Sequence, residues 1–378
     1  MTSSIAFPHA AKKRWKVKYP KRFVREVAST LDEFAPEYRG VLDAASSTMI
    51  KFLQETLDHW SQRGCVPRRD RQMFRKTKIV EALAFWAGFN IAGGLLPPSI
   101  PHVEVPDLVM TRFQSPLPKS SGIAVVIPIG DTSQRIENII TCNLQTLAEH
   151  QKISTVYLVF DGVDPVNMSL PKLPQGKISE LEIHPRSGPA TARNAGVTAA
   201  LRDNGTTGTR GVLFLDSDVS ISRASLDSLL EECRMPPGIM CPRILAADTT
   251  WLNRYHDISG TLNGRYLLGD SGKQLLFGTT SCMFVPRDLF DEGIAFSTDF
   301  RDAAGEDIDF CLRARLARFP ILAVDHVSVT HDYGYAGEGT ADWTAFKARF
   351  RRYGAGEWLL LERHPWYYHA LGKSIERI

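Results

Sequence analysis

Cysteine is scarce in this 378-residue sequence, and no two of its six cysteines form a Cys-x-x-Cys pair. That spacing argues against a zinc knuckle or a disulfide framework and fits a reducing cytosol. The most apolar stretch, residues 82–96, is shorter than the ~20 residues that a membrane span needs and includes Asn90, which favours a buried helix over shallow membrane contact. The basic N-terminus is followed by no apolar run, so we expect no signal peptide and a cytoplasmic protein, with contact to the inner face of a membrane left open.

Three motifs of common enzyme families are also missing. No G-x-G-x-x-G follows the first β-like apolar run, which disfavours an ordinary dinucleotide-binding fold. The sequence contains no G-x-x-x-x-G-K-[ST] phosphate loop and no G-x-S-x-G nucleophile elbow. Composition excludes little more, because 43% hydrophobic and 23% charged residues are ordinary for a soluble globular chain.

A strong excess of one charge is absent as well. Net charge is only +3, so we expect no nucleic-acid partner for the molecule as a whole. Basic residues nevertheless gather in two clusters, eight between Lys12 and Arg25 and six between Arg68 and Lys78. Such clusters suit an anionic partner such as phosphate, nucleic acid or a lipid surface, although a solvated face is the more common explanation.

The first 118 residues have a helical pattern that ends in a proline-rich linker. Apolar residues recur every three or four positions over residues 23–62, with a break predicted at Pro36 and Gly40. A further helix is predicted over residues 75–92, and the prolines between residues 95 and 122 indicate the linker. No catalytic motif occurs here, so this region could recognise a peptide or protein, form a homodimer or touch a membrane.

Residues 119–378 show strands alternating with helices. Helices are predicted up to about His150 and within residues 191–201. Short apolar runs rich in β-branched residues predict strands over residues 122–129, 156–162, 178–184 and 211–216. This alternation is the signature of a doubly wound α/β sheet.

Polar residues follow three of these apolar runs. Asp131 lies just past the first run, Asp161 ends the second, and Asp216 and Asp218 end the fourth. Because ligands of doubly wound sheets bind beyond the carboxyl ends of the strands, we expect these endings to face one crevice. Two carboxylates one residue apart repel each other unless a cation or water separates them, so the FLDSDVS stretch predicts either a polar turn or part of a metal site.

Between about residues 122 and 365 the chain resembles the family 2 glycosyltransferases, whose fold is called GT-A. The resemblance rests on an ordered set of motifs: VVIPIGD, FDG, RSGPATARNAG, FLDSD, FGTTSCMFVPRDLF, GEDIDFCLR and VSVTH. The GPATARNAG, LDSDV and YGAGEWLLLERHP segments are most similar to glycosyltransferases of the mycofactocin type. The resemblance implies a doubly wound, mostly parallel sheet with flanking helices, here preceded by the helical region. It also implies transfer of a sugar, with a hexose expected, from a nucleotide-sugar donor to an acceptor.

This reaction would need a metal ion. A diphosphate leaving group gains negative charge as its bond to the sugar breaks, and a hard divalent cation such as Mn²⁺ or Mg²⁺ stabilises that charge. By the resemblance, Asp218 is the direct ligand, and Asp216 binds the metal through water or binds the ribose. His331, which closes VSVTH, matches a third ligand, and His326 is the alternative.

The resemblance also implies a donor pocket at the strand ends. Asp161 matches an aspartate that accepts the N–H of uracil or guanine, and the alternative is a turn role before Gly162. Gly130 and Asp131 stand where the family usually has Asn or Glu, which leaves the base open, with a UDP-sugar favoured. Arg193, at a helix start, could contact the diphosphate or form a structural ion pair. The donor set implied is Pro128, Ile129, Asp161, Arg186, Gly188, Arg193, Asp216 and Ser217.

The acceptor side is predicted around GEDIDF and FGTTSCMF. Asp307 matches the general base of inverting members, which takes the proton of the acceptor hydroxyl, and a positioning role is the alternative. Gly278, Thr279 and Glu306 match acceptor-binding positions. Asp309 is expected to cap the helix or to form an ion pair. The acceptor itself, whether a peptide, natural product, lipid or glycan, is not specified by these residues.

Two segments near the end of the chain have open roles. The basic stretch FKARFRRYG, residues 346–354, could contact a diphosphate, an anionic acceptor or a membrane, or could form an exposed amphipathic helix. Residues 332–339 resemble a mobile loop that closes over the nucleotide.

Three other functions fit the sequence less well than an inverting transferase. A retaining transferase would share the D-x-D and the later histidine. A nucleotidyltransferase would need a Gly-rich basic loop after the first strand, where this chain has GDTSQR. Loss of Asp218 or Asp307 would indicate a silent nucleotide-sugar-binding module, but both residues are present.

Overall fold

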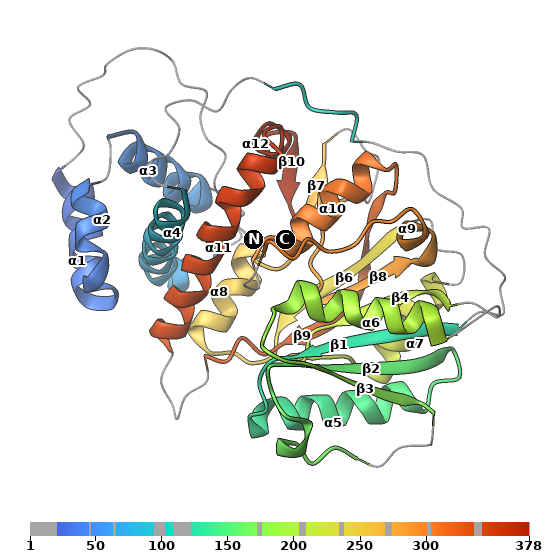
Figure 1. Ribbon diagram of the computed structural model, residues 1–378. Coiled ribbons are helices and arrows are strands. Elements are labelled where there is room, and N and C mark those ends of the chain that lie inside the picture. Colours follow the sequence, from blue (N-terminus) through green and yellow to red (C-terminus); the bar gives the residue numbers. More distant parts are fainter. Residues whose placement is uncertain are drawn as a thin grey trace.

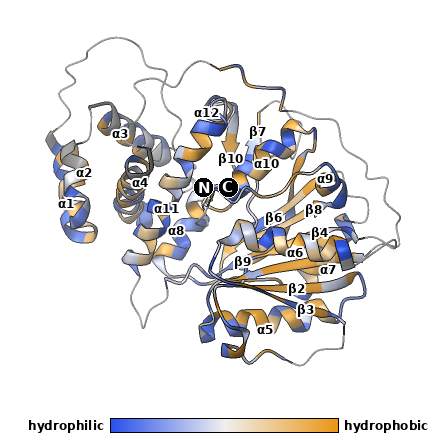
Figure 2. Ribbon diagram, in the orientation of Figure 1, coloured by the Kyte–Doolittle hydropathy of each residue, from blue (hydrophilic) through white to orange (hydrophobic). Residues whose placement is uncertain are grey.

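The computed structural model shows an α/β sheet domain beside a group of N-terminal helices, with the long helix α11 between them (Figure 1). It describes residues 21–44, 47–62, 66–93, 103–108, 122–171, 176–203, 209–233, 238–268, 274–300, 304–335 and 342–377. Figure 2 shows that the strands are mostly apolar, as strands buried on both faces should be.

One half of the eight-stranded sheet is parallel throughout and corresponds to the strands expected from the sequence. Its order is β3-β2-β1-β4. Burial of almost every side chain explains why β1, β2 and β4 have largely continuous apolar sequences, whereas β3, at the edge of the sheet, alternates and is partly exposed. Their bounds are Gly122–Ile129 for β1, Ile153–Asp161 for β2, Ile178–Ile183 for β3 and Thr209–Leu215 for β4.

The other half of the sheet is mixed and continues the order as β8-β6-β9-β5. β8 runs antiparallel to β4 and β6, β9 runs parallel to β6, and β5 runs antiparallel to β9. The bounds are Cys282–Pro286 for β8, Ile239–Ala246 for β6, Ile321–His331 for β9 and Val219–Ser220 for β5. A separate antiparallel pair joins β7 (Arg265–Leu267) to β10 (Ser374–Glu376).

Helices cover both faces of the parallel half. The crossovers β1-α5-β2 and β3-α6-β4 move in opposite directions across the sheet, so right-handed connections place α5 and α6 on opposite faces. Figure 1 shows α6 in front of β1. The bounds are Gln134–Ala148 for α5, Pro189–Asp203 for α6, Arg223–Glu232 for α7, Trp251–Ser259 for α8, Arg287–Asp291 for α9, Glu306–Leu316 for α10, Trp343–Arg363 for α11 and Tyr367–Leu371 for α12. A short 3-10 turn, η3, spans Pro165–Asn167.

The N-terminal helices agree with the helical pattern, with one difference. The break predicted at Pro36 is present, but Gly40 does not interrupt a helix, because it lies inside α2. The stretch expected to be a buried helix lies in α4, where residues 83–89 are buried. The bounds are Lys21–Phe34 for α1, Arg39–Ala44 for α2, Ser47–Gln62 for α3 and Arg71–Gly93 for α4, with 3-10 turns η1 at Pro36–Tyr38 and η2 at Arg68–Asp70.

α4 and α11 cross in close backbone contact. A Cβ at Gly88 would fall on the carbonyl oxygen of Arg351, and a Cβ at Gly354 would fall on that of Phe85. The two glycines therefore allow α4 and α11 to approach closely. Through this contact the N-terminal helices pack against the last long helix of the chain. The expected domain boundary near residue 118 lies outside the described residues.

These observations confirm the fold class expected from the GT-A resemblance, a doubly wound α/β sheet with flanking helices and a helical N-terminal region. In the part of the chain that the structure describes, no helix is both long enough and apolar enough to cross a bilayer. Many charges of the basic cluster between Arg68 and Lys78 are paired, since Arg75, Lys76 and Lys78 each contact a carboxylate.

Glu357, which α11 places in the core, makes stability depend on pH. Its side chain is 1% exposed, and burial raises its pKa to about 7 from an ordinary value of 4.5, with the Tyr368 hydroxyl partly opposing the shift. Between these two values the folded chain keeps a proton that the unfolded chain releases. The free energy of unfolding therefore falls as pH rises through this window.

We expect Glu357→Gln to raise the free energy of unfolding at pH 8 by up to about 3 kcal/mol and to change it little at pH 4, as measured by urea unfolding. Glutamine keeps the shape of the side chain and removes only its charge. An equal change in the free energy of unfolding at both pH values would show that packing, and not charge, causes the effect.

Candidate active site

The carboxyl ends of three strands meet at one edge of the sheet, as expected from the sequence. β2, β1 and β4 are neighbours and run parallel, so the residues that follow them share this edge. Asp161 is the last residue of β2, and Asp216 follows β4 directly. Pro128 and Ile129 close β1, where Ile129 is fully buried and Pro128 is partly exposed.

Asp161 fixes the loop that leads into α6. Its two carboxylate oxygens accept the backbone N–H groups of Ser187, at 2.7 Å, and Gly188, at 2.8 Å. Gly188 has φ of 90°, a conformation that disfavours other residues, so the loop depends on this glycine. The structure thus gives Asp161 a local structural role, and its contact with a base stays a prediction.

Arg186 lies across the ends of β1 and β2. A Cβ at Gly162 would collide with the Arg186 side chain, and a Cβ at Gly130 would lie 3.0 Å from Nη2 of Arg186. The side chain is exposed on the crevice edge. The glycines after both strands therefore leave room for a guanidinium, which is a suitable group for binding a phosphate or a base.

Arg193 links Asp216, which follows β4, to Glu306 at the start of α10. Its guanidinium donates to Asp216 Oδ1 at 2.7 Å and to Glu306 Oε1 at 2.9 Å. The Arg193 side chain is only 3% exposed, so its positive charge is compensated by the two carboxylates away from water. Its neighbour Asn194 exchanges two hydrogen bonds of 2.9 Å with the backbone of Phe296 and has a structural role.

Asp218 and His331 come together although they lie far apart in the sequence. β5 pairs with β9 so that Val219 lies opposite His331, and the N–H of Asp332 donates to the carbonyl of Asp218 at 2.8 Å. This pairing brings His331 Nε2 to 3.5 Å from Asp218 Oδ1. The Asp218 side chain is 27% exposed, which leaves it open to a ligand, whereas His331 is buried.

His331 is electrically neutral at ordinary pH. Burial, together with the positive charge of Arg349, lowers its pKa to about 3. In the described part of the chain, its buried Nδ1 has no hydrogen-bond partner. Burial also raises the pKa of Asp218, and the positive charges of Arg349 and Arg135 oppose that shift.

These two side chains fit part of a divalent-metal site. A neutral imidazole and a carboxylate are ordinary ligands of Mn²⁺, and the carboxylate also suits Mg²⁺. No set of three His, Cys, Asp or Glu side chains arranged to hold a metal occurs among the described residues. The remaining positions of a bound cation would therefore fall to water and to phosphate oxygens of a substrate.

Arg135 and Asp332, which lie near this pair, were not singled out from the sequence. Arg135, at the start of α5, lies 3.2 Å from Asp332 Oδ2 and is 39% exposed. Asp332 directly follows His331 in the sequence, and this position next to a proposed ligand could have identified it. Arg349 belongs to the basic stretch 346–354 and donates to the carbonyl of Tyr333 at 3.2 Å. Its positive charge is close enough to Asp218 to oppose the rise in the pKa of that carboxyl group.

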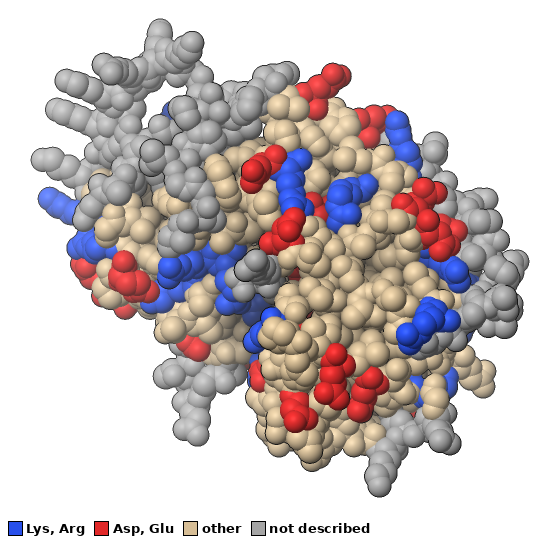
Figure 3. Space-filling view, in the orientation of Figure 1, with Lys and Arg blue, Asp and Glu red and all other residues tan. Residues whose placement is uncertain are grey.

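Other residues of that stretch face elsewhere. Lys347 pairs with Glu37 of the N-terminal helices, and Arg351 and Arg352 are exposed. Figure 3 shows Lys and Arg on the side of the N-terminal helices, with acidic groups beside them, and charges of both signs spread over the sheet domain. The alternative ligand His326 is exposed and pairs with Glu232 at 3.4 Å, so β9 does not bring it to Asp218. Residues 336–341, which include the second half of the expected mobile loop, lie outside the described residues.

Glu306 and Asp307 open α10 as a buried acidic pair. Burial raises the pKa of Glu306 to about 7, Asp307 adds to the shift, and Arg193 opposes it. Burial raises the pKa of Asp307 as well, and its Oδ1 accepts the N–H of Ile308 at 2.8 Å. Asp309 faces away and forms the expected ion pair, to Arg313 at 2.8 Å.

The predicted acceptor residues Gly278 and Thr279 are buried, and both have structural contacts. A Cβ at Gly278 would collide with Sγ of Cys241, so the glycine serves packing between strands. Thr279 donates its hydroxyl to the carbonyl of Leu262 at 2.9 Å. Their acceptor role stays a prediction, as does that of Ser217, which is partly exposed between the two aspartates.

Residues 211–376 match the family model of glycosyl transferase family group 2. The match covers less than half of the chain and includes Asp216, Asp218, Glu306, Asp307 and His331. The chain therefore contains a region similar to family 2 glycosyltransferases, and the mycofactocin type is not distinguished. A comparison with curated proteins gives no match.

Several solved structures are distantly similar. The S. aureus TarS fragment 1–349 is 16% identical, with 57% of this chain and 61% of that chain covered and a TM-score of 0.41. GalNAc-T7 with UDP, GalNAc and Mn²⁺ is 13% identical, with 58% and 44% covered and a TM-score of 0.41. The mannosyltransferase PcManGT from Pyrobaculum calidifontis, in complex with GDP-Man and Mn²⁺, is 13% identical, with 78% and 81% covered and a TM-score of 0.39.

This chain spans less than two thirds of the length of each TarS and GalNAc-T7 structure. Likenesses with such low identities and TM-scores carry no argument about the activity of this chain.

Proposed function

We propose that this protein transfers a hexose from a nucleotide sugar, with a UDP-sugar favoured, to an acceptor hydroxyl, and that a divalent cation, Mn²⁺ or Mg²⁺, assists the reaction. The observation that carries the proposal is the pairing of Asp218 with the buried His331 at the carboxyl edge of the sheet. The match of residues 211–376 to glycosyl transferase family group 2 supports the same reaction.

Asp218 and His331 would hold the cation, with Asp216 next to them. When bound, the cation would neutralise the charge that develops on the departing diphosphate. Asp216 is held by Arg193 through Oδ1, which leaves Oδ2 to accept a ribose hydroxyl or a water molecule. Arg135 and Arg349 flank this position, and their charges would attract the phosphates into it.

Asp307 would act as the general base. Its Oδ1 already accepts the N–H of Ile308, so Oδ2 is the oxygen that would take the proton from the acceptor hydroxyl. The acceptor oxygen would then attack the sugar carbon from the face opposite the diphosphate, which inverts the anomeric centre. Glu306, held by Arg193, would orient the acceptor beside this base. The acceptor could be a peptide, a natural product, a lipid or a glycan.

Calorimetry with UDP, GDP and their sugars, each with and without Mn²⁺, tests the donor and the metal together. We expect one nucleotide to bind, UDP in the first instance, and to bind measurably more tightly with Mn²⁺ present. A screen of UDP- and GDP-sugars for slow hydrolysis would identify the sugar. Binding that ignores Mn²⁺, or no binding by any nucleotide, would contradict the proposal.

The stereochemistry is tested separately, because it concerns the base rather than the metal. With a defined acceptor, NMR of the product from an α-linked donor should show a β-linked sugar. An α-linked product would remove Asp307 as a simple base and favour a retaining reaction.

A further inference from the structure

His331 lies at one end of a stack of aromatic rings that leads away from the crevice. The ring of Tyr333 is 4.3 Å from that of His331, with an angle of 27° between their planes. The same ring is 4.0 Å from that of His256, with an angle of 11°. Two rings this close to Tyr333 and nearly parallel to it cannot occupy the same face of it, so Tyr333 lies between the two imidazoles.

The ring stack takes over the role of the hydrogen bond that usually orients a metal-binding histidine. Such a histidine generally donates its second ring N–H to a carboxylate or a carbonyl, which fixes the ring. In the described part of this chain, Nδ1 of His331 is buried and has no partner, while Nε2 lies 3.5 Å from Asp218. The orientation of the imidazole therefore depends on its contact with Tyr333.

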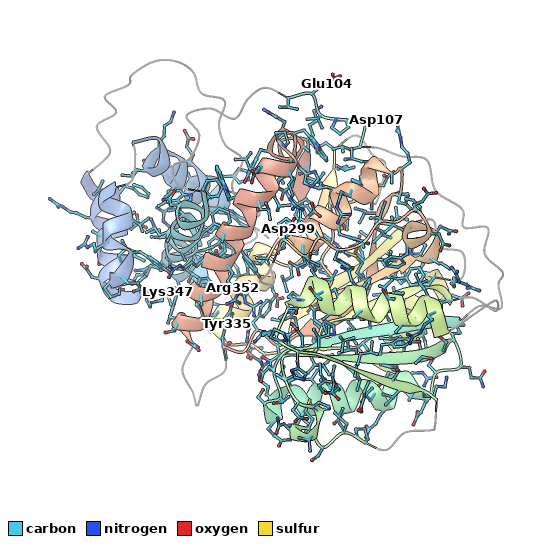
Figure 4. All side chains as sticks on the ribbon, in the orientation of Figure 1. Glu104, Asp107, Asp299, Tyr335, Lys347 and Arg352 are labelled. Carbon is cyan, nitrogen blue, oxygen red and sulfur yellow. The ribbon has the colours of Figure 1, made fainter. Side chains whose placement is uncertain are left out.

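The far end of the stack is fixed by three different elements. His256 belongs to α8, is 1% exposed, and places Nε2 3.0 Å from the hydroxyl of Tyr335. Its ring is also nearly parallel to that of Phe350 in α11, at 5.8 Å and 6°. Figure 4 shows Tyr335 beside α11, near Arg352. Fully buried rings with several partners have little freedom to turn.

α8 is itself fastened to the N-terminal helical region. The hydroxyl of Tyr255, which adjoins His256, donates to the carboxylate of Glu81 in α4. Glu81 is buried and is held by Lys78 at 2.7 Å. Trp251 Nε1 also donates to Thr77 Oγ1 of α4 at 2.7 Å, and Arg254 donates to Asp70 of the adjoining turn η2.

We propose that Tyr333 and His256 are positioning residues that hold the imidazole of His331 for a divalent cation, and that the N-terminal helices set this stack through α8. The inference rests on the proposed function, because it takes Asp218 and His331 as the ligands. It gives the N-terminal helical region a part in the chemistry without any contact with the substrate.

Pairs of variants that keep or remove a ring test the stack. We would titrate the full chain with Mn²⁺, alone and with UDP or GDP, and follow free Mn²⁺ by electron paramagnetic resonance. Tyr333→Leu and His256→Leu are expected to weaken Mn²⁺ binding about tenfold, the lower end of the effect of residues that orient metal ligands. Tyr333→Phe and His256→Phe keep the stacked ring and should bind Mn²⁺ as the wild type does.

A more distant variant tests the part played by the N-terminal helices. Tyr255→Phe removes the hydroxyl that contacts Glu81 and keeps the ring, and it should weaken Mn²⁺ binding by roughly two- to threefold. A spectroscopic readout separates positioning from general loss of structure. The ¹⁴N coupling of an imidazole to bound Mn²⁺, seen in spin-echo spectra, should be present in the wild type and reduced in Tyr333→Leu.

The possible results distinguish the two proposals. A wild-type protein that binds Mn²⁺, with leucine variants that bind it equally well, would overturn the positioning role alone. A wild-type protein that binds no Mn²⁺ with either nucleotide would overturn the metal-dependent function and this inference with it. If the leucine variants do not fold, Tyr255→Phe decides, and an unchanged Mn²⁺ affinity would overturn the role of the N-terminal helices.

Discussion

Replacing Asp218 with alanine is expected to abolish sugar transfer and the Mn²⁺-dependent part of nucleotide binding. Asp218 is the partly exposed carboxylate of the pair with His331, so its loss leaves only the imidazole to hold a cation. A metal ion contributes several kcal/mol to stabilising a departing phosphate, so we expect turnover to fall at least about a hundredfold. Calorimetry of UDP with and without Mn²⁺, together with donor hydrolysis, measures both effects.

Asp291→Ala is a suitable control for this variant. Asp291 lies at the end of α9, is exposed, and pairs only with Arg287 at 3.2 Å among the described residues. Loss of an exposed ion pair costs at most about 1 kcal/mol of stability, so the control should fold and bind as the wild type does. Mn²⁺-dependent nucleotide binding that survives in Asp218→Ala would show that the cation is held elsewhere.

Replacing Asp307 with asparagine is expected to abolish turnover while donor binding remains. Asparagine keeps the size of the side chain and can still accept the N–H of Ile308, but it cannot take a proton from an acceptor. General-base catalysis contributes roughly 10²- to 10⁴-fold, so kcat should fall within that range. Affinity for the nucleotide, measured by calorimetry, should change little.

Glu306→Gln is the matched comparison, because it alters the adjacent acid. Glu306 holds Arg193, which also holds Asp216, so its replacement should disturb nucleotide binding as well as turnover. The two variants thus have different expected patterns. If Glu306→Gln lost turnover with donor binding intact, and Asp307→Asn lost both, the roles assigned to the two acids would be exchanged.

Three strands of the parallel half of the sheet, β1, β2 and β4, could be predicted closely because nearly all of their side chains are buried. β1 was predicted at residues 122–129, and the structure has the same bounds. Such strands have uninterrupted apolar sequences, which are easy to recognise. The N-terminal helices were also recognisable, since α1 and α3 bury apolar residues at helical spacing, although Gly40 proved compatible with a short helix.

The mixed half lacked such a signal. β9 is interrupted by the exposed Asp325 and His326, and β6 has an irregular register at Pro242 and Arg243. β5 has only two residues, yet it is the strand that brings Asp218 to His331. Pairing between segments about a hundred residues apart depends on the whole fold, so local sequence patterns do not reveal it.

The site was predictable where carboxylates follow strands and unpredictable where packing decides. Asp216, Asp218 and His331 stood out by residue type and position. The contact of Tyr333 with His256, by contrast, joins a loop to a distant helix and leaves no spacing to recognise. Packing also accounts for the small residue at Gly278, where a Cβ would collide with Cys241, and its predicted acceptor role stays a prediction.

The close crossing of α4 and α11 limits how the chain can be shortened for laboratory work. A protein begun near residue 118 would contain the sheet and every proposed site residue, yet it would leave one side of α11 bare. That side includes Gly354 and Trp358, and the Trp358 ring lies 5.5 Å from that of Phe89 in α4. Apolar surface uncovered in this way promotes aggregation. Solubility of the sheet domain is therefore expected to depend on helices that hold none of the proposed site residues.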